Sequence, residues 1–192
     1  MQTLVHQELQ QLTALTRTLV DTFALYNEQK SELHRTLLTL LDDTGTTFRD
    51  RGRADKESHT ASLKAELTTA LRGINPMTME KPTVRRHEMQ NAIAFRVLQS
   101  LELELRDSLQ DAAQTLQRAE DLISQIVLAA MQKGLITNAD IANATTQAAV
   151  DALWRSIASD AEIALAQKRV LLLVSVFDVT LLLDEVLARL RA

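Results

Sequence analysis

The residues that could perform chemistry are few, and their spacing predicts no reactive site. The sequence contains no cysteine and four histidines, namely His6, His34, His59 and His87. A two-metal centre in a helical bundle uses Glu-x-x-His on two helices, whereas Glu8 and Glu32 each stand two residues from a histidine. That spacing points the two side chains to different faces of a helix. We therefore expect four surface histidines and no bound metal or cofactor.

Other enzyme motifs are also missing from the sequence. The lack of cysteine excludes disulfides, thiolate zinc sites and thiol nucleophiles. The sequence has no HExxH zinc motif, no glycine-rich phosphate loop and no serine in a nucleophile elbow. An all-α enzyme with scattered catalytic residues is the alternative, but the prediction is a protein that is not an enzyme and has no catalytic residues.

The composition predicts an all-α fold. The chain has 192 residues, of which 46% are hydrophobic and 3% are aromatic, with four glycines and two prolines. Leu, Ala, Thr, Glu, Gln and Arg dominate, a composition typical of long helices rather than of sandwiches or barrels. A chain of this size can form one domain, and we expect residues 1–192 to do so.

Glycine and proline mark the expected ends of the helices. They stand between segments of apolar periodicity at Gly45, Gly52, Gly73, Pro76, Pro82 and Gly134. The sequence therefore predicts four helices, three long and one short, over about residues 3–43, 55–72, 83–133 and 138–190. Helices of roughly fifty residues span on the order of 75 Å, so we expect an elongated up-and-down bundle, splayed or forked at one end.

Local signals refine two of these helices. The first carries a coiled-coil-like seam that is interrupted by two polar residues, Thr16 and Lys30. Before the last, Gly134 ends the preceding helix, and Thr137 with Asp140 forms a start of the capping-box type.

Residues 170–183 form the most apolar segment and have three interpretations. A membrane span needs about 20 apolar residues, so this segment is too short, and it contains Asp178. It can be the central helix of its own bundle, or it can place a second face against a partner. The expected interface residues are Leu171, Leu173, Val174, Phe177, Leu181 and Leu182.

Asp178 needs a separate explanation, because an acid on an apolar helix must be exposed, paired or protonated. We expect a single solvent-facing position. The alternatives are a polar contact that sets the register of neighbouring helices, or a cation site.

Residues 49–86 are rich in charge, and basic and acidic side chains alternate there. The plain interpretation is a solvated connector. The sharper hypothesis is an anion contact at one end of the bundle, formed by Arg51, Arg53, Arg85 and Arg86. The net charge of −4 and the lack of aromatic residues in this region argue against nucleic acid.

These observations predict a non-catalytic structural or protein–protein interaction protein. It would associate with itself or with a helical partner through the heptad-like seam and residues 170–183. One alternative is a small-molecule sensor or carrier whose pocket lies near Ala148, Ala152 and Trp154. A second alternative is a membrane-active helical protein. The sequence begins without a secretory signal, so the cytoplasm is the default location.

Overall fold

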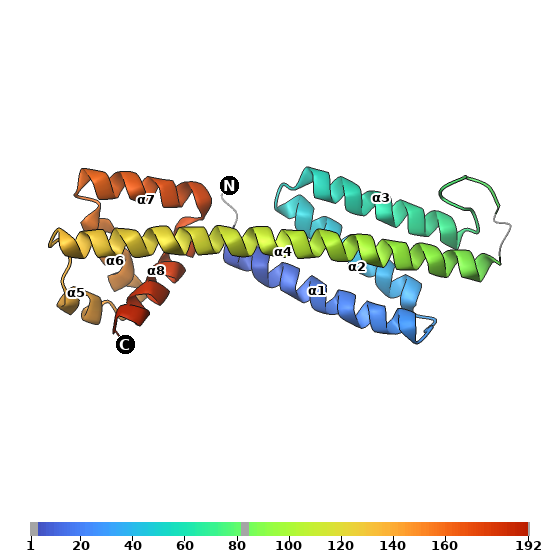
Figure 1. Cartoon of the computed structure of the whole chain (residues 1–192), viewed down its shortest axis with the longest axis horizontal. Coiled ribbons are helices and arrows are strands. Elements are labelled where there is room, and N and C mark those ends of the chain that lie inside the picture. Colours follow the sequence, from blue (N-terminus) through green and yellow to red (C-terminus); the bar gives the residue numbers. More distant parts are fainter. Residues whose placement is uncertain (1–3, 82–84, 192) are drawn as a thin grey trace. The chain divides into compact units, whose positions relative to one another are not determined.

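The all-α prediction is confirmed. The computed structural model describes residues 4–81 and 85–191, and it is 82% helical with no strand in those ranges (Figure 1). Within them the chain forms eight helices rather than about four. They are α1 (Val5–Asn27), α2 (Leu33–Asp50), α3 (Ala54–Leu71), α4 (Arg86–Gln132), α5 (Asn138–Asn143), α6 (Gln147–Ile157), α7 (Ala161–Leu173) and α8 (Val176–Arg191).

The middle of the chain follows the prediction closely. α3 and α4 match the expected helices at 55–72 and 83–133, although residue 83, like residue 3 at the first expected start, lies outside the described ranges. Gly73 follows α3 with φ +83° and Gly134 follows α4 with φ +70°. Both are left-handed positions that glycine adopts without strain, and they end the two helices.

The first predicted helix is wrong in two places. It divides into α1 and α2 at residues 28–32, where Lys30 is exposed and Gln29 has φ +53°. A charged side chain at a seam position is more stable in water, and the chain turns there instead of burying it. The expected break at Gly45 does not exist, because α2 continues through it to Asp50. A Cβ at Gly45 would lie 3.8 Å from Cγ2 of Thr60, so α3 packs closely against this part of α2.

The last predicted helix is also wrong, because residues 138–190 form four helices. The expected capping box of Thr137 and Asp140 is present at α5. Each later helix starts at a residue whose side-chain oxygen accepts a backbone N–H. Thr146 Oγ1 accepts from Ala149 at 3.3 Å, and Asp160 Oδ1 accepts from Glu162 at 3.0 Å. Ser175 Oγ accepts from Asp178 at 3.1 Å, so caps replace glycine and proline as helix breakers here.

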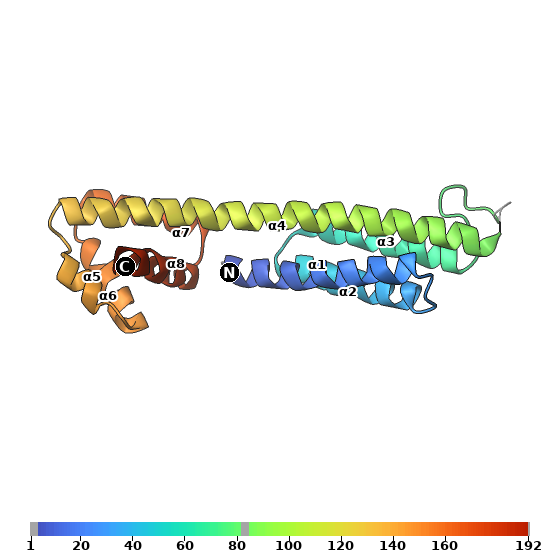
Figure 2. The ribbon, with the colours of Figure 1, turned by 60° about the horizontal axis from the view of Figure 1, so that its bottom comes forward.

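The helices group into two compact units. The first unit, Gln10–Gln110, contains most of α1, all of α2 and α3, and the first half of α4. These helices lie alongside one another, with a leucine-rich core (Figures 1 and 2). Tyr26 of α1 stacks on Phe95 of α4 with ring centroids 5.2 Å apart, and Lys56 of α3 donates to Ser108 of α4 at 2.8 Å.

The second unit consists of the residues up to Leu9 and those from Asp111 onward. Here α8 contacts α5, α6 and α7, so it is the central helix of this unit. Its buried face consists of Val179, Leu182, Leu183, Val186 and Leu187, together with Asp178. Thr180 donates to the Asp151 carboxylate of α6 at 2.8 Å.

Two leucines of α4 test the core assignment. Leu101 is fully buried, whereas Leu103 is 51% exposed. We expect Leu101→Ala to lower the free energy of unfolding by about 2–5 kcal/mol, because it leaves a cavity. The matched change Leu103→Ala should alter it by about 0.5 kcal/mol or less. Urea unfolding followed by circular dichroism measures both, and equal effects would contradict the assignment.

Candidate functional site

The start of α8 is built around the carboxylate of Asp178. Ser175 precedes α8, and its hydroxyl donates to Asp178 Oδ2 at 2.8 Å. In return the backbone N–H of Asp178 donates to Ser175 Oγ at 3.1 Å. The backbone N–H of Ser175 also donates to Asp178 Oδ2 at 3.3 Å, so the two residues form a capping box with Asp in the third helical position, which satisfies N–H groups that a helix start leaves without partners.

The same carboxylate also holds the start of α1. The backbone N–H of Val5 donates to Oδ2 at 3.0 Å, and that of His6 donates to Oδ1 at 3.1 Å. The Nδ1 atom of His6 lies 2.9 Å from Oδ1. Since an ionised carboxylate only accepts hydrogen bonds, this contact requires the proton of His6 to be on Nδ1. One side chain therefore caps two helices.

The expectation of a solvent-facing Asp178 is wrong, because its side chain is fully buried. Burial raises the pKa of this carboxyl, but the hydrogen bonds from Val5, His6 and Ser175 outweigh burial and hold it below the ordinary value. N–H and O–H donors surround the oxygens, so they stabilise the carboxylate without a cation. The described residues include no group of three or more metal-ligating side chains. Among the interpretations of Asp178, a polar contact that sets the register of neighbouring helices agrees with these hydrogen bonds.

Several large apolar side chains are exposed where α7 meets α8. Leu172 is 84% exposed, Val176 is 65% exposed and Phe177 is 51% exposed. Leu173 and Leu181 are also exposed. We call these five residues the α7–α8 face. The turn at 174–175 exposes these side chains, because Val170 before it and Val179 after it are the residues that point into the core.

The structure divides the six predicted interface residues. Leu173, Phe177 and Leu181 belong to the α7–α8 face, and Leu171 is half-buried. Val174 and Leu182 lie in the core instead. The sequence missed Leu172 and Val176, because a continuous helix through 170–183 gives a different set of faces from two helices with a break at Ser175.

Charged residues flank the α7–α8 face in the sequence. Lys168 and Arg169 precede it on α7, and Asp184 and Glu185 follow it on α8; all four are exposed. Leu165, Arg169 and Leu172 are spaced to share one face of α7. On α8, Phe177, Leu181 and Asp184 line one groove of about 140 Å³ with Thr146 and Val150.

The predicted anion contact is not formed by the four arginines together. Arg53 stands at the start of α3, while Arg86 donates to the carbonyl of Leu71 at its end. α3 has 18 residues and spans about 27 Å, so the Arg51–Arg53 and Arg85–Arg86 pairs lie at opposite ends of it. Arg51 donates to the Gln11 side chain at 2.7 Å.

The small residues that the sequence placed around a ligand pocket do not enclose one. Ala148 and Ala152 are exposed on α6, so they do not allow the close approach of a neighbouring helix that the sequence suggested. Trp154 is half-buried, and its backbone carbonyl accepts from the Gln167 side chain at 2.7 Å.

Comparisons with known proteins add no functional information. The chain matches no protein-family model, no curated protein and no solved structure. Among the described residues, no helix combines the length and the apolar character that crossing a membrane requires. The functional argument therefore depends on the residues of this chain alone.

We expect Asp178→Asn to lower the free energy of unfolding at pH 7 by about 3 kcal/mol or more. An amide replaces a charged acceptor of hydrogen bonds, and hydrogen bonds to charged groups are worth about 1.5–3 kcal/mol each. The control Asp184→Asn changes an exposed acid of the same helix, whose ion pair with Arg191 is worth about 1 kcal/mol or less. Chemical denaturation compares the two, and equal losses would contradict the role of Asp178.

The effect of Asp178→Asn should depend on pH. The pKa of Asp178 is lowered by folding, so the folded state binds fewer protons than the unfolded state, whose pKa is about 3.9. The stabilisation is complete well above that pKa and is lost as pH falls through it and then through the lower folded value. The difference in stability between wild type and Asp178→Asn should therefore shrink as pH falls below about 4, the unfolded pKa. A constant difference from pH 7 to pH 2.5 would refute this account.

Proposed function

We propose that this protein is a non-catalytic interaction protein whose α7–α8 face binds a second copy of the chain. The observation that carries the proposal is the exposure of five large apolar side chains within residues 172–181. Large exposed apolar side chains gathered in one short segment are typical of binding surfaces. Scattered single leucines elsewhere, such as Leu103, need no such explanation.

The charges around the α7–α8 face favour a second copy over an unrelated partner. Basic Lys168 and Arg169 precede it in the sequence, and acidic Asp184 and Glu185 follow it. In a two-fold symmetric dimer, a residue i that contacts j is matched by j contacting i. An antiparallel arrangement of two copies therefore places each basic pair opposite an acidic pair while the apolar residues meet in the centre.

A rigid support for the α7–α8 face strengthens the proposal. Phe177 precedes the buried Asp178 directly, and the hydrogen bonds of that carboxylate fix the first turn of α8. Fixed side chains lose little conformational freedom when they bind, so less of the binding free energy is offset by ordering.

The heptad-like seam of α1 and α2 is not part of the proposed interface. Leu12, Leu19 and Leu37 from that seam are buried in the core of the first unit. They are unavailable to a second copy unless the unit opens. The proposed association uses the second unit only.

The first test is the absolute mass in solution by light scattering coupled to size exclusion, at several protein concentrations. We expect a dimer for the wild type and a monomer for Leu172→Glu, because the charge cannot be buried in an apolar contact. Leu103→Glu, a similar change at an exposed leucine of α4, should remain a dimer. A monomeric wild type, or equal effects of the two variants, would contradict the proposal. Binding of the wild-type monomer to anionic liposomes would favour the membrane-active alternative instead.

Charge exchange tests the antiparallel geometry. Arg169→Glu should weaken the dimer, because it places an acid opposite the partner's acidic pair. The double variant Arg169→Glu with Glu185→Arg should restore much of the affinity, since each copy then carries exchanged charges. Dissociation constants from sedimentation at low salt measure this, and failure of the double variant to recover would exclude the arrangement.

A further inference from the structure

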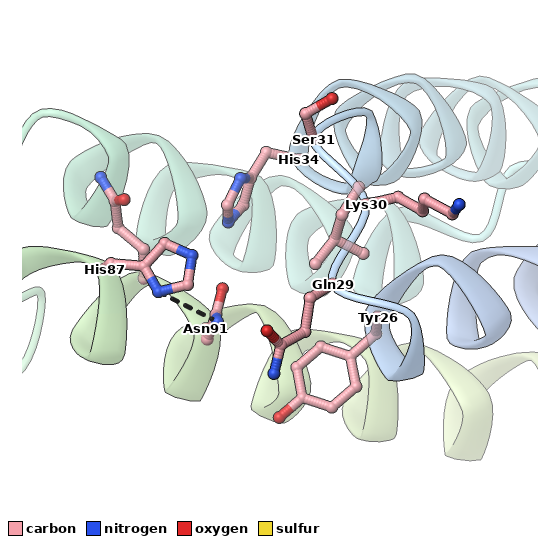
Figure 3. A pocket seen from close by; sticks show the side chains of 9 residues that line it. Tyr26, Gln29, Lys30, Ser31, His34, His87 and Asn91 are labelled. Atoms are coloured by element: carbon pink, nitrogen blue, oxygen red, sulfur yellow. Dashed lines mark hydrogen bonds between the residues drawn. The ribbon is translucent and has the colours of Figure 1, made fainter.

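A separate polar pocket lies in the first unit, where the turn between α1 and α2 meets α4. Its volume is about 330 Å³, at the lower end of the range for small-molecule sites. Figure 3 shows Tyr26, Lys30, His34, His87 and Asn91 around it. No carboxylate is among its lining residues. The pocket shares no residue with the α7–α8 face, and the inference below goes beyond the proposed self-association.

The two histidines of the pocket have unequal partners. Asn91 Nδ2 lies 3.4 Å from His87 Nδ1, and an amide NH₂ can only donate, so His87 Nδ1 accepts and the proton of the neutral ring is on Nε2. His34 Nε2 is buried and has no hydrogen-bond partner among the described residues. Buried polar atoms are nearly always paired, so an unpaired ring nitrogen beside a cavity indicates a missing partner.

The residues that line the pocket include one lysine, two histidines and no acid. α2 begins here, and its N-cap residue Glu32 makes no side-chain cap hydrogen bond, so that side chain does not accept the first backbone N–H groups of α2. The Lys30 ammonium lies on the same turn, 3.5 Å from the Glu28 carboxylate. Burial lowers the pKa of His34, and the positive charge that His87 carries when its ring is protonated lowers it further.

We propose that this pocket binds a small anion that presents carboxylate or phosphate oxygens. The oxygens of such an anion can accept one hydrogen bond from Nε2–H of His87 and another from a protonated Nε2 of His34. Lys30 and the start of α2 add attraction for negative charge. A cationic ligand would meet Lys30 and the helix dipole as repulsive groups.

Binding of the anion should be coupled to protonation. The bound negative charge favours the charged form of His34, so the protein takes up a proton and the affinity increases as pH falls from 8 to 6. Other charged groups on the surrounding segments set the background potential: Glu28, Glu32, Arg35, Arg72, Arg86 and Glu88.

The experiment is a titration of the full chain with inorganic phosphate and, separately, with succinate, at pH 6 and pH 8. Histidine side-chain NMR signals report the site, with sodium chloride of equal ionic strength as the reference. We expect saturable shifts of His34 and His87 but not of His59, with an affinity roughly tenfold higher at pH 6. A response to phosphate alone or to succinate alone identifies the oxygen chemistry and supports the proposal.

Variants keep the test independent of folding. His34→Asn should abolish the response, and Lys30→Gln should weaken it several-fold without affecting the fold, because Lys30 is exposed. His59→Asn and Lys168→Gln are the matched controls and should bind like the wild type. The proposal is overturned by non-saturable shifts, by loss of binding in the controls, or by tight Zn²⁺ binding to His34 and His87 without any response to either anion.

Discussion

The buried carboxylate of Asp178 is the interaction on which the second unit depends. It accepts hydrogen bonds from residues that stand 172 and 173 positions earlier in the chain, and it closes the capping box of its own helix. A buried charge is tolerated only when it is fully hydrogen-bonded, so α8 and the start of α1 have one arrangement that keeps Asp178 stable. The break at Ser175 follows from the same arrangement.

That break decides which apolar side chains the protein exposes. A continuous helix through residues 170–183 would distribute them around its whole surface, whereas α7 and α8 bury Val170, Val174 and Val179 and leave Leu172 and Phe177 in water. Basic residues precede these exposed side chains in the sequence, and acidic residues follow them. The proposed dimer thus derives from a polar interaction within the core. The polar pocket of the first unit arises similarly, where the chain turns at Lys30 rather than bury it.

Helix content and the ends marked by glycine were predictable, because Gly73 and Gly134 adopt left-handed φ values that few other residues adopt. The breaks before α6, α7 and α8 were missed, although Thr146, Asp160 and Ser175 are all favoured N-cap residues. Such residues are also common inside helices and on surfaces, so the signal is weak without the tertiary contacts. The partner of Asp178 could not be found from spacing, because it lies at the other end of the chain. His34 and His87 likewise meet only through folding.

The most direct test of the central claim is the distance between labelled copies in solution. The chain has no cysteine, so Ala188→Cys attaches one spin label beside the α7–α8 face, and Ser62→Cys attaches one to α3 in the first unit. In double electron–electron resonance, a two-fold dimer through the α7–α8 face gives a defined intermolecular distance for label 188. Its amplitude should disappear when Leu172→Glu is added. The account is contradicted if neither label 188 nor label 62 shows dipolar coupling between copies. It is also contradicted if the coupling of label 188 survives Leu172→Glu.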